Sequence, residues 1–328
     1  MGRDMVHLTR RDVLRGAGAA GAALALPRAS RAASWPERDI AFIIPDAPGG
    51  GFDSVVRALA PALEKYLPNK VNVVPTNVVG GGGNRAATQL FRTKPDGTSI
   101  GIFNIPGLFI AQQQGDAGYD LPKFTWLGRV GEDIYALGVG ANSPLKSIAD
   151  MKTLSQTRPV KFTSTGSAGT AYAATQIATN LLGIKAQIIT GYKGSSEYAL
   201  AAIRGDGDAV ITTMSLLQRL RASGDLRILA SFEPHSAVPG ADDATTLQQP
   251  ELALITLERL IAAPPALPAD IKAALADALW KALGDPQIVD WAKQADINLA
   301  RETPDHAAAT LADQAKFFEK WKHVLVAS

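Results

Sequence analysis

The sequence has no cysteine in 328 residues and only four histidines. Without cysteine there are no disulfide bonds, so stability must come from a core that a 46% apolar composition can form. His7 lies in the N-terminal segment, and His235, His306 and His323 are neither spaced like metal ligands nor next to a plausible nucleophile. The G-x-S-x-G elbow is also missing. We therefore expect no metal, no cofactor and no catalytic residue.

Long hydrophobic runs are missing as well, because no stretch after the N-terminus reaches the roughly 20 apolar residues of a membrane-spanning helix. This predicts a soluble mature protein. The N-terminus itself has the order of an export signal: Thr9–Arg15 resembles a twin-arginine motif, Gly16–Leu26 is apolar but short, and Ser30–Ala32 is rich in small residues. We expect residues 1–32 to be a twin-arginine signal, cleaved near Ala32, and the protein to be periplasmic.

An excess of positive charge is absent once this segment is removed. The whole chain has 33 basic and 31 acidic residues, and the first 32 residues hold six of the former and two of the latter. The remainder therefore has 27 basic and 29 acidic residues, a formal charge of −2. This removes any general argument for a nucleic acid or an anionic membrane surface as partner.

The stretch Asp39–Leu63 carries the first structural signal. Ile40–Ile44 is apolar and predicts a buried strand, Pro45–Gly51 predicts a glycine-rich turn, and apolar residues spaced by three and four predict a helix from about Asp53. Pro61 should either kink this helix or begin a second one. Glycines let the backbone approach a ligand, and the free N–H groups of a helix start attract anions.

This turn does not match the common nucleotide motifs. A P-loop requires Lys and Ser or Thr after the glycines, where this chain has Phe52-Asp53-Ser54, and the contiguous glycines do not fit a dinucleotide fingerprint. Taken alone, the cluster could equally be a tight turn without a ligand. The ligand interpretation gains from repetition, because similar turns follow predicted strands at Gly80–Asn84, Gly166–Thr170 and Tyr192–Ser195. In open parallel sheets such turns lie at the carboxyl ends of the strands, where ligands bind.

The rest of the chain extends the α/β pattern. Thr125–Val130 and Tyr135–Val139 are expected as two strands leading out of the first lobe, and the third strand is expected to end in a turn at Asn104–Gly107. A strand near Leu252–Leu257 could return to that lobe. The C-terminal part predicts helices starting at about Pro268, Pro286 and Thr303-Pro304.

The residues resemble the Bug (TctC-like) substrate-binding proteins of tripartite tricarboxylate transporters. The resemblance lies in Ile43–Asp53, Thr163–Ser167 and Tyr192–Ser195, supported by Thr125–Gly128 and Ala263–Pro268. It implies two α/β lobes joined by strand crossovers, around a cleft that binds a small carboxylated solute through backbone amides and ordered water. Three positions depart from the family pattern: Tyr172 replaces a His, Thr212 replaces an Asp, and Glu258-Arg259 replaces an aromatic pair.

The turns and the resemblance together give the candidate ligand-binding residues: Asp46, Gly49, Gly50, Gly51, Phe52, Asp53, Gly82, Asn84, Asn104, Ser167, Gly169, Thr170, Tyr172, Tyr192, Lys193, Gly194 and Thr213. Several have a second interpretation. Asp53 could cap its own helix. Lys193 could be a solvated loop residue, and Tyr192 and Phe52 could belong to the core. Ser167 and Thr170 are hydroxyl donors beside a helix start.

We therefore expect a two-lobed periplasmic binding protein-like α/β fold, with a mostly parallel sheet flanked by helices in each lobe and a cleft between the lobes. Lobe 1 is expected to comprise residues 33–136 and 256–328, and lobe 2 residues 137–255. The predicted function is that of a monomeric solute receptor that delivers a small carboxylate to membrane permease subunits. The alternatives are a sensory binding protein for a membrane kinase and a twin-arginine-exported enzyme.

Overall fold

The computed structural model describes residues 35–326 except 114, 116, 167, 168 and 296. The predicted export signal and Ser167 lie outside the described residues. The strands are β1 (Ile40–Ile44), β2 (Val73–Asn77), β3 (Ser99–Asn104), β4 (Thr125–Gly140), β5 (Val160–Thr163), β6 (Ala186–Ile189), β7 (Ala209–Thr213), β8 (Leu226–Ser231), β9 (Thr256–Ala263) and β10 (Leu299–Glu302).

The helices follow the strands in a repeated βα order. They are α2 (Gly51–Tyr66), α3 (Asn84–Phe91), α4 (Ile105–Gln113), α5 (Ile148–Thr157), α6 (Thr170–Leu182), α7 (Ser195–Arg204), α8 (Met214–Ala222), α9 (Ala269–Leu283), α10 (Pro286–Gln294) and α11 (Pro304–Val326), with short 3-10 turns η2 (Gly81–Gly83), η3 (Leu121–Lys123) and η4 (Pro250–Leu254).

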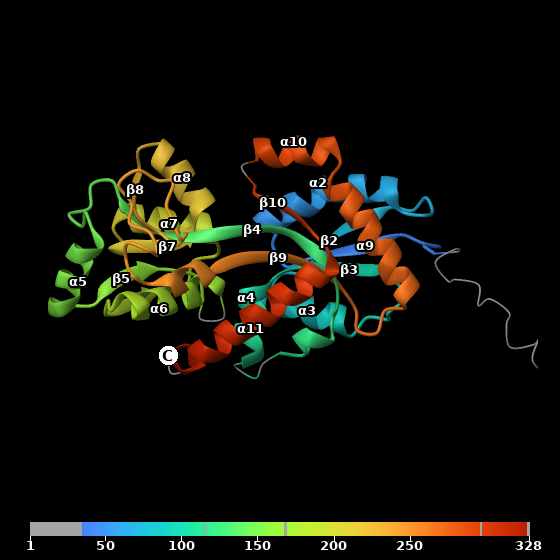
Figure 1. Ribbon diagram of the computed structural model, residues 1–328, viewed down its shortest axis with the longest axis horizontal. Coiled ribbons are helices and arrows are strands. Elements are labelled where there is room, and N and C mark those ends of the chain that lie inside the picture. The colour runs from blue at the N-terminus through green and yellow to red at the C-terminus, as the bar shows by residue number, and fades with distance from the viewer. Residues whose placement is uncertain (1–34, 114, 116, 167–168, 296, 327–328) are drawn as a thin grey trace, which may run out of the picture.

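The strands form two parallel groups joined by antiparallel crossovers. The main order is β2-β1-β3-β9-β4-β7-β5-β6, and β8 and β10 also pair with β4. β1 pairs in parallel with β2 and β3, and β5 pairs in parallel with β6 and β7. We call the part with β1–β3 lobe 1 and the part with β5–β7 lobe 2. Helices flank both groups, and β4 and β9 run between them (Figure 1). The predicted two-lobed α/β architecture is confirmed, whereas the residue boundaries of the lobes stay a prediction.

Strand β4 is the main connection between the lobes. Its first part, Thr125–Ile134, pairs with β9. In its second part, Tyr135–Gly138 pairs with β7 and Ala136–Gly140 pairs with β8. The prediction of two separate strands was wrong. The polar residues between them stay extended because they pair with β9, as in Glu132 opposite Glu258. A single strand thus changes partners between the lobes at Ile134 and Tyr135.

One further local prediction was wrong, one of two alternatives for Pro61 is excluded, and one strand was missed. The chain does not turn at Asn104–Gly107 but enters α4, where Pro106 is tolerated because first-turn N–H groups have no intrahelical partner. Pro61 does not begin a second helix and lies inside a single helix α2. Strand β10 was missed because its four residues, Leu299–Glu302, are too few to show a clear alternating pattern. The predicted C-terminal helices are confirmed as α9, α10 and α11.

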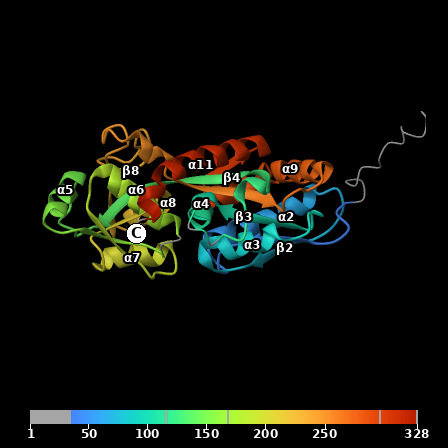
Figure 2. The same ribbon diagram turned by 90° about the horizontal axis from the view of Figure 1, so that it is seen from below.

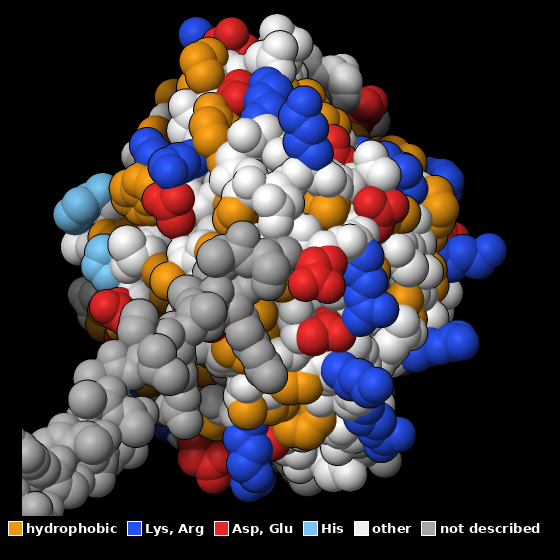
Figure 3. Space-filling model, turned by 90° about the vertical axis from the view of Figure 1, so that its right-hand side faces the viewer, with side chains coloured by type: hydrophobic (Ala, Val, Ile, Leu, Met, Phe, Trp, Pro, Cys, Tyr) orange, Lys and Arg blue, Asp and Glu red, His pale blue; other side chains and the backbone are white. Residues whose placement is uncertain are grey.

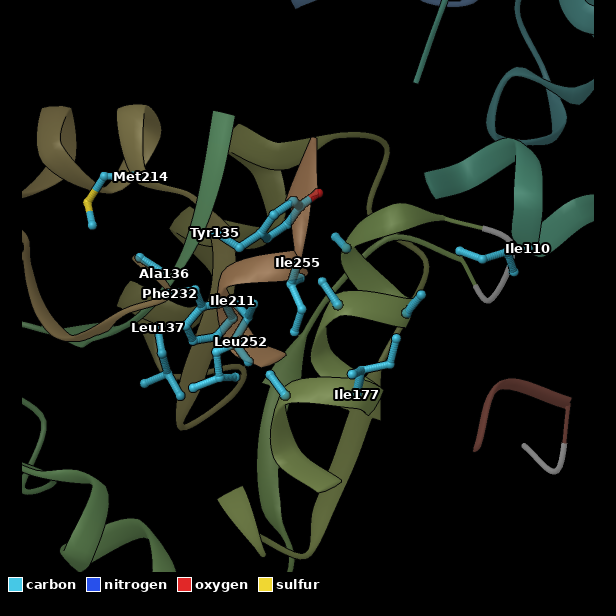
Figure 4. Packing of buried hydrophobic residues seen from close by; sticks show 14 of the residues in the cluster. Ile110, Tyr135, Ala136, Leu137, Ile177, Ile211, Met214, Phe232, Leu252 and Ile255 are labelled. Atoms are coloured by element: carbon cyan, nitrogen blue, oxygen red, sulfur yellow. The ribbon is translucent and has the colours of Figure 1, made fainter. Parts of the chain in front are cut away.

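Two hydrophobic clusters hold these elements. One lies where β1 and β3 face α2 and α9, and includes Phe42, Leu59 and Leu279. The other lies on the opposite face of that sheet and continues through lobe 2, and includes Phe103, Phe162 and Ile211. Figure 4 shows Ile211 and Phe232 packed near Leu252, with the hydroxyl of Tyr135 pointing away from them. The core is therefore continuous from lobe 2 into lobe 1 at the crossovers.

The long helix α11 packs against α4, β4 and α6, so it touches both lobes. Figure 2 shows α11 lying along both crossover strands. On the face at the lobe 1 end, basic and acidic side chains are interspersed (Figure 3). No helix within the described part of the chain combines the length and apolar character needed to cross a bilayer.

Candidate functional site

A cavity of about 900 Å³ lies between the lobes. Lobe 1 contributes the β1–α2 turn, Gly80–Gly83 and the end of β3, and lobe 2 contributes the turns before α6 and α7. All four predicted glycine-rich turns thus open on one space. The reason is topological, since each follows the carboxyl end of a parallel strand and each lobe presents those ends to the other.

Twelve of the candidate residues line this cavity: Asp46, Gly49, Gly50, Gly51, Phe52, Gly82, Asn104, Gly169, Thr170, Tyr192, Lys193 and Gly194. The described candidates Asp53, Asn84, Tyr172 and Thr213 do not. Asp53 is buried beneath its own turn, and Tyr172 accepts a hydrogen bond of 3.3 Å from Gln176 within α6. Asn84 begins α3, and Thr213 ends β7. Participation of any of these residues in binding stays a prediction.

Three of the helices that begin at the cavity wall are α2 from lobe 1, and α6 and α7 from lobe 2. Their N-cap residues are Gly50, Gly169 and Gly194, none of which has a side chain to cap the helix. The first N–H groups of a helix have no intrahelical partner, and the helix dipole places partial positive charge there. The cavity is therefore surrounded by helix ends that favour a negatively charged group.

The second glycine-rich turn depends on its glycines. Gly80, Gly81, Gly82 and Gly83 have φ values of 135°, 59°, 61° and 98°, a region that other residues seldom adopt. A Cβ at Gly83 would lie 3.4 Å from Cβ of Pro45 on the neighbouring turn. Four consecutive glycines thus let this segment pass close to the β1–α2 turn at the cavity wall.

Asp53 stabilises the β1–α2 turn rather than facing the cavity. Its carboxylate accepts hydrogen bonds from the Gly49 N–H at 2.8 Å, from Nε of Arg57 at 2.8 Å and from Nδ2 of Asn77 at 2.9 Å. The hydrogen bond from Arg57 is the main reason that the pKa of Asp53 falls to about 2. Asp53 was expected either to bind the ligand or to cap its own helix. These bonds favour a role within its own turn, although the N-cap is Gly50 and not Asp53.

Asp46 does face the cavity. Its Oδ2 accepts the Phe52 N–H at 3.3 Å. Burial raises the pKa of Asp46, because desolvation disfavours the charged form, while that N–H and the nearby guanidinium of Arg259 act in the opposite direction. The cavity therefore holds a carboxylate with few stabilising partners.

Arg259 lies next to this wall, against Phe52, and was not among the predicted site residues. Its guanidinium is 5.9 Å from the ring centroid of Phe52 and 4.0 Å from Oδ2 of Asp133, and its side chain is only 12% exposed. Its Nε and Nη1 are buried without a hydrogen-bond partner among the described residues. Burial lowers the pKa of Arg259. One signal was visible in the sequence, the departure from the family's aromatic pair.

Tyr135 and Glu197 are among the cavity residues that were not predicted. Tyr135 lines the cavity from the middle of β4, which could not be foreseen while β4 was expected to break there. Glu197 is the third residue of α7, and its carboxylate accepts the Lys193 N–H at 2.7 Å. An acidic residue at this helix position is a recognised capping signal and could have been read from the sequence.

Nothing in the described part of the chain forms a group of three or more His, Asp or Glu residues suited to a metal ion. The groups that can bind a ligand at the cavity are backbone N–H groups, hydroxyls and a few charged side chains.

The model of the TctC family, described as "Tripartite tricarboxylate transporter family receptor", matches residues 55–326. The chain belongs to the TctC family. A second model, for the twin-arginine translocation signal, matches residues 7–27. This TctC protein is therefore exported by the twin-arginine route to the periplasm, as predicted, while cleavage near Ala32 stays a prediction.

Curated relatives of this TctC chain extend over nearly its full length. A UPF0065 protein from the tcbD-tcbE intergenic region of a Pseudomonas species is 25% identical over 98% of this chain and 96% of its own. A UPF0065 protein from Bordetella bronchiseptica is 26% identical over 91% of this chain and 88% of its own.

Solved structures share the fold. The periplasmic binding protein BugD superposes with a TM-score of 0.76 at 21% identity, covering 89% of this chain and 99% of its own. MatC from Rhodopseudomonas palustris, solved with bound malate, gives a TM-score of 0.76 at 19% identity, covering 89% of this chain and 100% of its own. R. palustris Rpa4515, solved with adipate, gives 0.72 at 20% identity, covering 89% of this chain and 98% of its own. The family and these neighbours are solute-binding proteins.

Proposed function

We propose that this protein is not an enzyme but a receptor that captures a small carboxylated solute in the periplasm and delivers it, as a monomer, to the membrane permease of a tripartite tricarboxylate-type transporter. The observation that carries the proposal is the meeting of three helix N-termini with glycine N-caps, from two lobes, at one cavity. Malate in MatC and adipate in Rpa4515 support a carboxylate as the ligand class.

The binding free energy that the carboxylate requires explains why several turns must contribute to the site. An exposed helix terminus stabilises an anion by about 0.3–1 kcal/mol, and a hydrogen bond to a charged group contributes about 1.5–3 kcal/mol. Micromolar binding needs roughly 8 kcal/mol after the cost of association. One turn is therefore insufficient, whereas donors from both lobes acting together reach this value. Ligand binding would favour the closed arrangement of the lobes.

The test is a thermal-shift screen of small carboxylic acids on the protein without residues 1–32. A ligand at 100 times its Kd stabilises the folded state by about 2.7 kcal/mol and raises Tm. The variant Gly194→Val should lose the shift: Gly194 has an extended φ of −176°, and a Cβ there meets no atom within 4 Å, so the larger side chain fills cavity space without backbone strain.

Thr153→Val, at an exposed position of α5 away from the cavity, is the control and should keep the shift. If no acid stabilises the wild-type protein, the receptor function is wrong. Delivery is tested separately, by uptake of the identified ligand in cells with and without this protein.

A further inference from the structure

The charged side chains of the cavity wall do not match a ligand that is only an anion. Lys193 is the one basic residue in this wall and Asp46 and Glu197 are the acidic ones, counted over the described residues, which gives a formal charge of −1. Glu197 is already engaged with the Lys193 N–H. The wall thus adds a negative charge to a site that, under the proposed function, receives a carboxylate.

The charged residues of the wall are divided between the lobes. Asp46 belongs to the β1–α2 turn of lobe 1, whereas Lys193 belongs to the turn before α7 in lobe 2. Lys193 is exposed and its Nζ forms no ion pair within the described part of the chain. The cation of the wall thus lies in lobe 2, next to the carboxylate of Glu197, whereas Asp46 beside the start of α2 faces the cavity from lobe 1 without a cation on its own side.

Three N–H groups of the β1–α2 turn and of the first turn of α2 are used by the protein itself. Phe52 N–H donates to Asp46 at 3.3 Å, Gly49 N–H donates to Asp53 at 2.8 Å, and Gly50 N–H donates to the carbonyl of Ala47 at 3.0 Å. A ligand carboxylate placed here would find these three donors occupied and would meet Asp46. Lobe 2 is the better position for the carboxylate.

Asp46 lacks a cation of its own. It forms no ion pair with any described residue, and Arg259, the nearby guanidinium, does not line the cavity and is shared with Asp133 at 4.0 Å. Burial raises the pKa of Asp46, and the Phe52 N–H and the nearby Arg259 do not outweigh it. A half-buried carboxylate in this state is stabilised by a positively charged donor supplied from the cavity.

We propose that the ligand is a carboxylate that also carries an ammonium group, with its carboxylate at the starts of α6 and α7 and its ammonium against Asp46. This inference rests on the proposed function and adds the class of ligand: an amino acid-type zwitterion rather than a simple di- or tricarboxylate.

The experiment compares matched ligand pairs by isothermal titration calorimetry on the chain without residues 1–32. The pairs are aspartate and succinate, glutamate and glutarate, alanine and propionate, and 5-aminovalerate and valerate, which differ only in the amine. We expect the amino member of at least one pair to bind at least tenfold more tightly to the wild type. In Asp46→Asn, which keeps the shape and an acceptor for the Phe52 N–H, this ratio should fall toward one.

Asp277→Asn on the exposed face of α9 is the control and should leave the ratio unchanged. Circular dichroism and Tm establish that the Asp46 variant folds, and Asp46→Ser replaces it if it does not. Binding of the acids without the amine as tightly as their amino partners in every pair overturns the inference but leaves the receptor function standing. A preference for the amino member that persists in the Asp46 variant also overturns the inference and leaves the receptor function standing. Failure of all members to bind, together with a negative acid screen, overturns both.

Discussion

Nδ2 of Asn104, at the end of β3 in lobe 1, donates a hydrogen bond of 2.6 Å to Oγ1 of Thr170, the first residue of α6 in lobe 2. Both residues line the cavity, so this bond joins the lobes at the site itself. Gly107 makes the approach possible, because a Cβ there would lie 2.9 Å from the same Oγ1. The bond can exist only while the lobes are together.

Thr170→Val removes the acceptor with little change in shape. Losing one hydrogen bond costs about 1 kcal/mol, which changes the ratio of closed to open protein roughly fivefold. We expect a larger radius of gyration of the ligand-free protein in small-angle scattering. Asn104→Ala should do the same, and the double variant should add little. Additive effects of the two substitutions would contradict a direct bond.

Asp53→Asn should destabilise the protein by about 1–3 kcal/mol, because a charged acceptor of three hydrogen bonds becomes a neutral one that accepts at a single oxygen. Denaturant unfolding at pH 7 measures this. Asp277→Asn, whose carboxylate forms only an exposed ion pair, is the control and should stay within about 0.5 kcal/mol.

The pH dependence of the Asp53 contribution has a defined sign. The folded-state pKa of about 2 lies below the unfolded value of about 3.9, so the stabilisation is present above pH 4 and is lost as pH falls toward 2. We expect the difference in unfolding free energy between wild type and Asp53→Asn to shrink across this window. A difference that is constant from pH 5 to 2 would rule out the assigned role.

Arg259→Met should raise the pKa of Asp46, because it removes the nearby positive charge that stabilises the carboxylate. Carbon-13 NMR titration of labelled aspartate carboxyl groups measures the change. Arg57→Met is the matched control: it should raise the pKa of Asp53, whose main partner it removes, and leave that of Asp46 unmoved. An unchanged pKa of Asp46 in the Arg259→Met variant would show that the charges of Asp46 and Arg259 do not interact.

Arg129→Met should cost about 3–5 kcal/mol, because it leaves the buried carboxylate of Glu258 without its cation. Nε of Arg129 lies 2.9 Å from Oε2 of Glu258, which is 3% exposed, and Glu132 and Glu302 also pair with this guanidinium. Burial raises the pKa of Glu258. The double variant with Glu258→Gln should be more stable than Arg129→Met alone. If the double variant and Arg129→Met are equally stable, the loss of stability does not come from an unpaired Glu258 carboxylate.

Most of the architecture was accessible from the sequence because it depends on local patterns. Ile40–Ile44 is apolar throughout and forms buried β1, and glycines follow the strands where the structure has turns. Prolines mark the starts of α10 and α11. Failures came where tertiary contacts overrode local composition, as in the Gly-Glu-Asp segment of β4, which is held extended by β9.

The site was predictable in its backbone and less so in its side chains. Glycine-rich turns can be recognised in the sequence, and twelve of the seventeen candidate residues line the cavity. Arg259 and Tyr135 could not be placed, because their positions at the cavity depend on how β9 and β4 cross between the lobes. Asp53 could be assigned to its own turn only once Gly49, Arg57 and Asn77 were seen around its carboxylate.

Short segments of the chain specify the export signal, the succession of strands, glycine turns and helices, and membership of a receptor family. They can do so because each segment carries its own periodicity and turn chemistry. Which charges share the cavity depends instead on long-range contacts: Asp46 faces it, Asp53 turns away from it, and Arg259 stays behind Phe52. Burial and the partners brought by distant strands set the effective charge of each group, and neither is encoded in a local pattern.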